Sequence, residues 1–381
     1  MTKELIYIIS LFFLGSLISC STNKEKSDLD PVIGVWITNV DSDIMLSDEA
    51  IANGMKKIAD LGFNTVFPVV WNDGYTLYPS DVMTKTFGEE FNQDSLLKGQ
   101  DRDPLEVIIK ESKKQGLKVI PWFEFGFSSS YNQNGGHILA AKPNWAALDS
   151  SGKLLKKNNF EWMNALHPEV QRFMTSLVLE VAKNYDVDGI QGDDRLPAMP
   201  SEGGYSVFTR ELYLEETGKV VPNNPSEDDF LNWKARKLTE YASVLYDSIK
   251  SVDQNLIVSF SPSIYPWSKE QYLQDWPSWI EEGAVDLLIP QAYRWDIESY
   301  KNTIDGMIDN YQTSTGHEKV KIVPGIIIKA GDRYNGFEYV REAVKHNREK
   351  GLDGEVYFFY EGLFDQNDHL GDSLKKYFYA E

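Results

Sequence analysis

The sequence predicts an α/β fold, a single-domain (β/α)8 TIM barrel. Eight short segments rich in β-branched and aromatic residues recur along the chain, with amphipathic helical patterns between them. Strictly alternating strands and helices are typical of a parallel sheet, and eight such units are typical of a closed barrel. A doubly wound sheet is the main alternative, but the glycine-rich phosphate loop that would favour it does not follow the first predicted strand.

The predicted strands are short apolar runs bounded by polar or turn-forming residues. We expect them at residues 32–39, 65–71, 118–125, 189–194, 256–262, 286–293, 319–328 and 354–361. Long loops follow the second and third strands, at residues 72–103 and 126–167. Long loops in a compact domain are usually functional or disordered, and the Tyr and Trp residues of these two favour ligand binding.

The predicted helices carry apolar residues at three- and four-residue spacing. We expect them at residues 47–61, 104–116, 168–185, 230–252, 269–281, 296–311 and 337–350, before a weaker C-terminal helix. The second shows typical end signals, because Asp103 precedes Pro104 at its start and Gly116 stands at its end.

The first 30 residues are predicted to lie outside the barrel. Residues 1–19 contain an early lysine and an apolar run of the length that a secretory signal peptide has. Their ending, Leu17-Ile18-Ser19-Cys20, resembles the lipobox of bacterial lipoproteins, which implies cleavage before Cys20 and acylation of its sulfur. Cys20 is the only cysteine, so it has no internal disulfide partner. An ordinary signal peptide with a chance cysteine is the alternative.

Residues 20–30 are polar and read as a tether, so the barrel is assigned to residues 31–381. The expected location is the bacterial cell envelope, where a lipid on Cys20 holds the protein on a membrane that it does not span. The net charge of −20 argues against nucleic acid or an anionic membrane surface as a direct ligand. Aromatic residues make up 13% of the chain, which suits a core together with a sugar-binding cleft.

The most informative stretch is the fourth predicted strand, which ends in two adjacent carboxylates, Asp193 and Asp194. Side chains alternate along a strand, so Gln191 and Asp193 share one face while Ile190 lies on the other. This pattern fits a barrel strand whose apolar residue packs on an outer helix. Catalytic groups of such barrels sit at the carboxyl ends of the strands. A helix cap, or an ion pair with Arg195, is the structural alternative for these acids.

Polar and aromatic residues also gather at the other predicted strand ends. Flat rings stack on the apolar faces of sugars, while amides and carboxylates bind their hydroxyl groups, so a polysaccharide or oligosaccharide is the expected partner. The predicted substrate-binding residues are Trp36, Trp71, Asn72, Trp122, Gln191, Gln291, Tyr293 and Trp295.

Metal and cofactor chemistry is not indicated by the sequence. None of the five histidines forms a pair with zinc-ligand spacing. The Gly-x-Ser-x-Gly motif of serine hydrolases is absent. We therefore expect neither a metal nor a cofactor.

The chain resembles the bacterial glycosyl-hydrolase-like family 10 proteins. The matching motifs come in the family's order across about residues 32–362; they include Gly34-Val35-Trp36, Tyr78-Pro79-Ser80, Leu166-His167-Pro168 and Asp188-Gly189-Ile190 with Asp193-Asp194. The resemblance implies a secreted or lipid-anchored TIM barrel with glycosidase activity. At least one relative is understood to cut peptidoglycan strands stripped of their stem peptides.

The resemblance also bears on the catalytic residues. The strand-four motif is similar to that of α-amylase-type barrels, where the nucleophilic Asp stands four residues after the Gly, and the same count from Gly189 reaches Asp193. Asp193 is therefore predicted as the nucleophile or base, with Asp194 as a hydrogen-bonding or sugar-binding neighbour. Two like charges this close raise the pKa of one of them.

Glu124 is the first candidate for the general acid, because it shares a strand face with Trp122. Many family members have Asn-Pro where this chain has Glu124-Phe125, so the assignment applies to a subgroup. Glu361 is the second candidate and Asp296 the third. The sequence thus predicts a lipid-anchored glycoside hydrolase that acts on an envelope or scavenged polysaccharide, including denuded peptidoglycan. A non-catalytic carbohydrate-binding lipoprotein on an inactive barrel is the alternative function.

Overall fold

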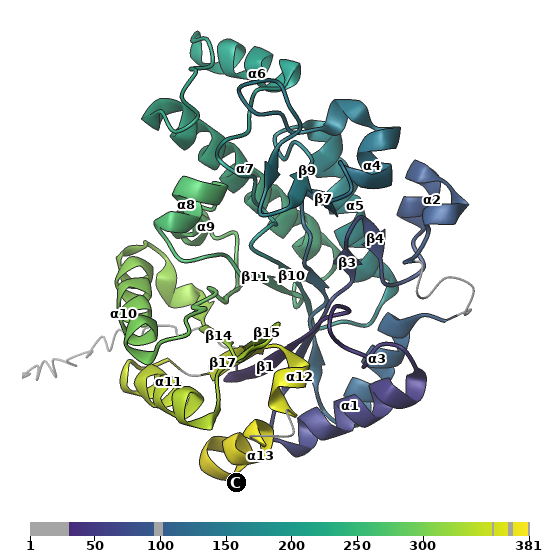
Figure 1. Ribbon diagram of the computed structural model, residues 1–381, viewed down its shortest axis with the longest axis vertical. Helices are drawn as coiled ribbons and strands as arrows, with labels where there is room; N and C mark the ends of the chain where they lie inside the picture. The colour runs from purple at the N-terminus through teal and green to yellow at the C-terminus, as the bar shows by residue number, and fades with distance from the viewer. Residues whose placement is uncertain (1–29, 95–101, 353, 365–368, 380–381) are drawn as a thin grey trace, which may run out of the picture.

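The computed structural model describes residues 30–94, 102–352, 354–364 and 369–379 of the 381-residue chain. A ring of parallel strands lies at its centre, and helices surround that ring (Figure 1). The predicted TIM barrel is therefore confirmed. The predicted signal peptide, Cys20 and all of the tether but its last residue lie outside the described residues.

The barrel consists of two five-stranded sheets that continue into each other. The first sheet contains, in spatial order, β14 (Gly325–Ile327), β17 (Gly354–Phe358), β1 (Val32–Ile37), β2 (Thr65–Pro68) and β5 (Lys118–Val119). The second contains β13 (Lys321–Ile322), β12 (Leu287–Leu288), β11 (Ile257–Phe260), β10 (Gly189–Gly192) and β6 (Trp122–Phe123). Parallel bridges join them at two seams, one between Val69 and Trp122 and one between Gln291 and Gly325.

Two predicted strands are interrupted at these seams. The predicted strand 118–125 is divided into β5 and β6, and the strand 319–328 into β13 and β14. Pro121 and Pro324 lie in the two gaps. Proline has no backbone N–H to donate to a neighbouring strand, which explains why the ladder breaks there.

The outer layer is formed by amphipathic helices that bury one face against the strands. They are α1 (Asp48–Asp60), α3 (Pro104–Lys114), α5 (Pro168–Asn184), α7 (Asp228–Val252), α10 (Ile297–Thr313) and α11 (Phe337–Glu349). Helix starts follow the sequence signals: the side chains of Ser47, Asp103 and Asp296 each accept a hydrogen bond from a backbone N–H of the first turn. None of the described helices is both long and apolar enough to cross a membrane.

The single helix predicted over residues 269–281 was wrong. The structure has two short helices there, α8 (Trp267–Tyr272) and α9 (Trp276–Glu281), and Leu273 between them adopts a left-handed conformation with φ of 61°. The buried Gln274 explains the break, because its side chain donates to the carbonyl of Asp193 and accepts from the N–H of Ser263. These bonds hold the segment against the end of β10.

Small elements cover the carboxyl end of the barrel, where the two long loops were predicted. The first loop forms β3 (Trp71–Asn72), β4 (Tyr75–Thr76) and α2 (Asp81–Phe87), and the second forms β7 (Ser128–Tyr131), α4 (Gly136–Ala141), β8 (Lys156–Lys157) and β9 (Phe160–Trp162). Asp73 ties the two loops together, because it accepts hydrogen bonds from the Tyr131 N–H at 2.8 Å and the Gln133 side chain at 2.6 Å.

The remaining elements are short. They are η1 (Glu89–Phe91), η2 (Pro143–Trp145), α6 (Val207–Thr217), η3 (His317–Lys319), β15 (Lys329–Ala330), β16 (Arg333–Tyr334), α12 (Tyr360–Leu363), α13 (Leu370–Leu374) and η4 (Lys375–Tyr379).

A buried carboxylate fastens the C-terminal segment to the amino end of the barrel. Glu355, at the start of β17, has no exposed surface and accepts hydrogen bonds from Arg348 at 2.9 Å and from the Tyr379 hydroxyl. The Tyr357 hydroxyl lies 2.7 Å from that of Tyr379, and Phe63 packs against both rings. Burial raises the pKa of Glu355, and the Arg348 charge opposes this shift.

Candidate active site

Strand register brings three polar side chains to the same level of the barrel. Gln191 in β10 pairs with Trp122 in β6 on one side and with Ser259 in β11 on the other. Two residues further along each parallel strand, the same inward face carries Asp193, Glu124 and Ser261. Asp193 and Glu124 therefore face each other from neighbouring strands at the carboxyl end of the barrel.

Arg195 lies at the centre of this group. Its guanidinium nitrogens are 3.0 Å from an Asp193 oxygen, 3.0 Å from an Asp194 oxygen and 3.5 Å from a Glu124 oxygen. Its Nε donates to the Glu124 backbone carbonyl at 2.9 Å, and the guanidinium stacks 4.5 Å above the Phe160 ring. Three carboxylates thus share one positive charge. We call these four ionisable residues the Arg195 cluster.

Asp193 is the most enclosed member of the Arg195 cluster. It is 2% exposed, and one oxygen accepts hydrogen bonds from Gln291 at 2.7 Å and Ser261 at 3.0 Å. Burial raises the pKa of Asp193 well above its ordinary value, and the negative charge of Asp194 raises it further, while Arg195 opposes the shift. Asp193 therefore holds a proton more readily than an exposed aspartate does.

Glu124 is more open, with 15% of its side chain exposed. Asn72 donates a hydrogen bond of 2.6 Å to one of its oxygens, which fixes the carboxyl group next to the hairpin of β3 and β4. Burial raises the pKa of Glu124, whereas the charge of Arg195 and the bond from Asn72 lower it. Two carboxyl groups with raised pKa values thus face each other across one guanidinium.

A buried polar layer supports the Arg195 cluster from inside the barrel. The Trp36 indole donates to Gln191 at 2.7 Å, and Gln191 donates to Ser259 at 3.0 Å. Trp36, Trp122 and Gln191 are between 0% and 2% exposed. The hydrogen bonds of Trp36 and Gln191 fix the face of β10 that Asp193 shares.

Two partly exposed rings lie beside the acids. The Tyr293 and Phe358 ring centroids are 5.4 Å apart, and both rings pack on Trp36. Burial raises the pKa of Tyr293, and the charges of Asp193 and Asp194 add to this effect, which places its hydroxyl near both acids. These rings offer a wall against which a sugar ring can stack.

The comparisons with known proteins agree with this geometry. The model of the family Glycosyl hydrolase-like 10 matches residues 31–335. The chain belongs to this family. The resemblance found in the sequence is therefore confirmed.

Two of the proteins that are similar to this chain in sequence are glycosyl hydrolases by name. Glycosyl hydrolase DigH of Escherichia coli strain K12 is 26% identical over 297 residues, which cover 71% of this chain and 63% of DigH. Glycosyl hydrolase YngK of Bacillus subtilis strain 168 is 21% identical over 354 residues, covering 85% of this chain and 65% of YngK. The chain thus spans less than two thirds of the length of either relative.

Solved structures of glycosidases share the fold. The PgaB (BpsB) glycoside hydrolase domain from Bordetella bronchiseptica superposes with a TM-score of 0.66 at 13% identity, covering 93% of this chain and 99% of that domain. The catalytic domain of β-amylase from Paenibacillus polymyxa gives a TM-score of 0.63 at 12% identity, covering 93% and 98%. At these identities the likeness shows the TIM-barrel fold alone.

Within this family member, the structure brings together most of the residues predicted for the site. Asp193, Asp194, Glu124, Asn72 and Gln291 lie within one network of hydrogen bonds and ion pairs. Tyr293 borders that network, whereas Trp36, Trp122 and Gln191 lie beneath it.

Other predicted residues lie elsewhere. Trp71 is fully buried and donates to the Gly126 carbonyl at 3.0 Å, so it is a core residue. Trp295 stacks under Arg333, with 4.3 Å between the guanidinium and the ring. Asp296 caps α10. Glu361 bonds to Ser42 in a separate pocket after β1 and β17.

Sequence reasoning missed two residues that shape the Arg195 cluster and anticipated a third only in part. The ion pair of Arg195 with the strand-four acids, named as the structural alternative, is present, and Arg195 also contacts Glu124. Ser261 has the same strand-face parity as Asp193, and that signal was available in the sequence. Gln274 had no such signal, because it is placed by the break between α8 and α9. In the part of the chain that the structure describes, no group of three or more His, Cys, Asp or Glu side chains is arranged to hold a metal.

Proposed function

We propose that this protein is a glycoside hydrolase that cleaves O-glycosidic bonds with the carboxyl groups of Asp193 and Glu124. One observation carries the proposal: three carboxylates share a single guanidinium at the carboxyl ends of adjacent barrel strands. Such a group contains both an acid that keeps its proton and an anion, which glycosidic bond cleavage requires together.

The spacing of the pair favours a retaining reaction. Asp193 and Glu124 oxygens lie 3.0 Å and 3.5 Å from the same Arg195 nitrogen, Nη2. These oxygens are therefore no more than about 6.5 Å apart, whereas carboxyl separations are about 5–5.5 Å in retaining enzymes and about 6.5–9.5 Å in inverting ones. In the retaining sequence, one carboxyl protonates the leaving oxygen while the other bonds to C1. Water, deprotonated by the first residue, then hydrolyses the ester and restores both groups.

Chemical rescue with azide assigns the two roles. The alanine variant of the nucleophile leaves space for azide, which then yields a glycosyl azide of inverted configuration. The alanine variant of the acid lets azide intercept the ester, which yields a glycosyl azide of retained configuration. From the sequence assignment we expect inversion with Asp193→Ala and retention with Glu124→Ala, measured by NMR with an activated aryl glycoside. The reverse pair of outcomes exchanges the roles, as the strongly raised pKa of Asp193 would favour.

The substrate is proposed to be a cell-envelope or scavenged polysaccharide, with peptidoglycan strands free of stem peptides as one candidate. Support comes from the family relationship and from the predicted lipid attachment at Cys20, which would place the enzyme at a membrane surface. The test is incubation of the wild type and Asp193→Asn with peptidoglycan glycan strands, with and without stem peptides, and with neutral glucans. Wild-type-only products, detected by mass spectrometry, establish the glycosidase and its bond.

The lipid attachment has its own test in a bacterial expression host. Mass spectrometry of the membrane fraction should show an acylated Cys20 at the new N-terminus, and a Cys20→Ser variant should leave that fraction. Membrane association that persists in this variant would contradict the anchor.

One observation favours a second function, the non-catalytic carbohydrate binder. Arg195 contacts all three acids, and ion pairs that hold these carboxyl groups in place would let the site bind sugar without cleaving it. In that case the wild type and Asp193→Asn would bind glycans alike, and neither would release product.

A further inference from the structure

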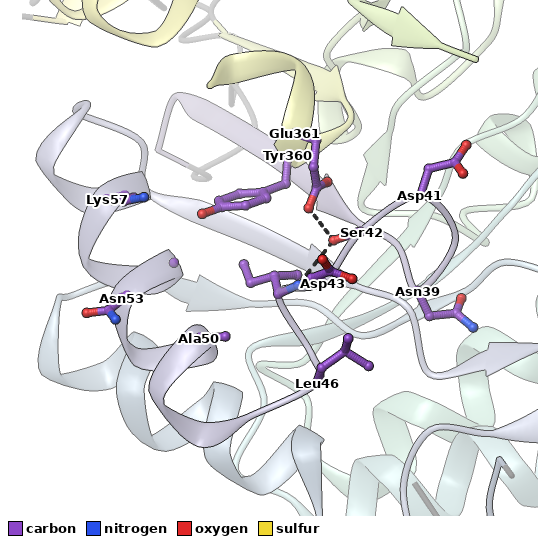
Figure 2. Close-up of a pocket in the computed structure, with 12 residues that line it drawn as sticks. Asn39, Asp41, Ser42, Asp43, Leu46, Ala50, Asn53, Lys57, Tyr360 and Glu361 are labelled. Carbon is purple, nitrogen blue, oxygen red and sulfur yellow. Dashed lines mark hydrogen bonds between the residues drawn. The ribbon is translucent and has the colours of Figure 1, made fainter. Parts of the chain in front are cut away.

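A polar cavity outside the Arg195 cluster opens at the carboxyl ends of β1 and β17. Its volume is about 610 Å³, within the range of about 300–1,000 Å³ that small-molecule sites have. Figure 2 shows Tyr360 and Glu361 of α12 lying across it from Asn53 and Ala50 of α1. Because β1 and β17 run parallel to β10, this cavity opens on the same face of the barrel as Asp193. We call it the β1 pocket.

Two buried polar atoms in the β1 pocket lack a hydrogen-bond partner. One Glu361 oxygen accepts from the Ser42 hydroxyl, but its other oxygen, Oε2, has none. Oδ1 of Asn39 is also buried without a partner. A buried polar atom without a partner costs about 1–3 kcal/mol, so a ligand that bonds to these atoms recovers that energy. Carboxylate oxygens accept hydrogen bonds only, so the ligand must supply donors.

The charge of the β1 pocket restricts the ligand further. Asp41, Asp43 and Glu361 contribute three carboxylates to the lining, whereas Lys57 contributes one ammonium group. That ammonium group lies 5.5 Å from the Phe364 ring centroid. An excess of negative charge disfavours an anionic ligand and favours a neutral or cationic one.

The β1 pocket also has the mixed character that suits a sugar. Leu46, which is 48% exposed, and the Tyr360 ring supply apolar surface. Asn53 adds an amide, and Figure 2 shows the Tyr360 hydroxyl directed toward the α1 side of the cavity. A saccharide presents an apolar ring face and several hydroxyl donors, which match both kinds of surface.

Two partly exposed aromatic rings lie beside the acids, and one of them is close in sequence to the β1 pocket. Phe358 precedes Tyr360 by two residues, and its ring centroid is 5.4 Å from that of Tyr293. The charge of Asp193 acts on the Tyr293 hydroxyl. A glycan lying along these two rings would extend from the Arg195 cluster toward the segment that contributes Tyr360 and Glu361 to the β1 pocket.

We propose that the β1 pocket binds one non-acidic glycosyl unit, neutral or amine-bearing, of the chain that the Arg195 cluster cleaves. Its part in holding a substrate chain rests on the proposed function, whereas the binding of the sugar unit itself does not. The substrate is thus an oligosaccharide or polysaccharide of several units that lacks carboxylates at the bound position.

The experiment titrates the full chain with D-glucosamine, D-glucose, N-acetyl-D-glucosamine and D-glucuronate while NMR follows the side-chain amides of ¹⁵N-labelled asparagine. We expect D-glucosamine to shift the Asn39 and Asn53 signals at the lowest concentration, followed by the two neutral sugars. D-Glucuronate should leave them unchanged. Glu361→Gln should weaken D-glucosamine binding about tenfold, because it removes a charged acceptor.

Two further variants test whether the sugar binds in the β1 pocket and not elsewhere on the protein. Glu49→Gln removes the same charge from an exposed position on α1 outside the lining, so its affinity should match that of the wild type. Asn53→Ala removes a lining amide from an exposed helix position, where alanine favours the helix, and should weaken binding while the protein stays folded.

Three outcomes would overturn the proposal: no sugar shifts either amide, D-glucuronate binds as well as D-glucosamine, or Glu49→Gln weakens binding as much as Glu361→Gln. The proposed function fails separately, when no glycan is hydrolysed although sugars still bind in the β1 pocket. If hydrolysis depends on Asp193 but no sugar binds in the β1 pocket, the proposed enzyme activity stands and the proposed role of the β1 pocket is wrong.

Discussion

The two ends of this barrel each bury a carboxylate beside an arginine, and the two arrangements differ in charge. At the amino end, Glu355 has one guanidinium and a tyrosine hydroxyl for its single carboxylate. At the carboxyl end, Asp193 shares one guanidinium with Asp194 and Glu124. Both acids are 0–2% exposed, so burial alone does not distinguish them. The ratio of acids to bases therefore distinguishes a structural ion pair from a reactive group.

The physical reason lies in what each arrangement does with a proton. A matched buried pair holds both charges in place, and breaking it destabilises the fold. Three acids around one base cannot all ionise without repulsion, so protons remain available at near-neutral pH. The amino end therefore contributes stability, while the carboxyl end is prepared for chemistry at some cost in stability.

The largest expected effect is on activity, with Asp193→Asn. We expect kcat/KM to fall by about 10²–10⁴-fold, the usual contribution of a positioned acid or base. Near pH 4, the free energy of unfolding should change by less than about 1 kcal/mol, because Arg195 keeps two carboxylate partners. Steady-state kinetics and urea denaturation measure the two quantities. If the variant is strongly destabilised but its folded fraction keeps full activity, Asp193 serves stability and not catalysis.

The second expected effect is on stability, with Glu355→Gln at the other end. Removing one partner of a buried pair costs about 3–5 kcal/mol. We expect about 2 kcal/mol here, since the Arg348 side chain is 36% exposed and can reach water. The urea midpoint should fall, while kcat/KM measured well below the transition should match the wild type. Arg348→Met is the matched variant, and it should lose more because it leaves the Glu355 charge unpaired.

The smallest expected effect is a difference in pH dependence. The pKa of Asp193 is raised in the folded state, so its contribution to stability is fully present below its ordinary value of 3.8 and is lost as pH rises toward the raised value. The Asp193→Asn variant has no titrating carboxyl group at this position, so it does not lose this stability as pH rises. Relative to the wild type, the variant should become more stable as pH rises from about 4 toward 7. Equal slopes for the two proteins in denaturation series would mean that Asp193 is ionised throughout.

Much of the fold was predictable because periodicity is a local property. The strand and helix patterns predicted all eight barrel positions, and Asp103 caps its helix as expected. The two interrupted strands and the division between α8 and α9 were not predicted. The strand interruptions coincide with Pro121 and Pro324, which are visible in the sequence, whereas the division between α8 and α9 depends on the contact of Gln274 with Asp193, which joins distant parts of the chain.

The sequence predicted which strand faces carry the residues of the candidate site, but not how deeply each side chain is buried. Alternation along the strand placed Asp193 and Gln191 on the inward face, and the register then placed Glu124 opposite Asp193. Parity does not say how far a side chain lies from solvent, and the buried Trp71 shows this. The central position of Arg195 was also beyond the sequence, because it depends on three residues reaching one guanidinium from different strands and loops.

The two seams of the barrel have a mechanical consequence. Each seam is a place where proline interrupts the hydrogen-bond ladder, and each lies beside residues of the site: Trp122 at one, Gln291 at the other. The ring thus consists of two half-shells, and backbone hydrogen bonds from Val70 to the Trp122 carbonyl and from Gly325 to the Pro290 carbonyl join them beside the site. A ligand that contacts both half-shells would restrain their motion relative to each other. Amide hydrogen exchange near Val69 and Gly325 should therefore slow when the ligand binds.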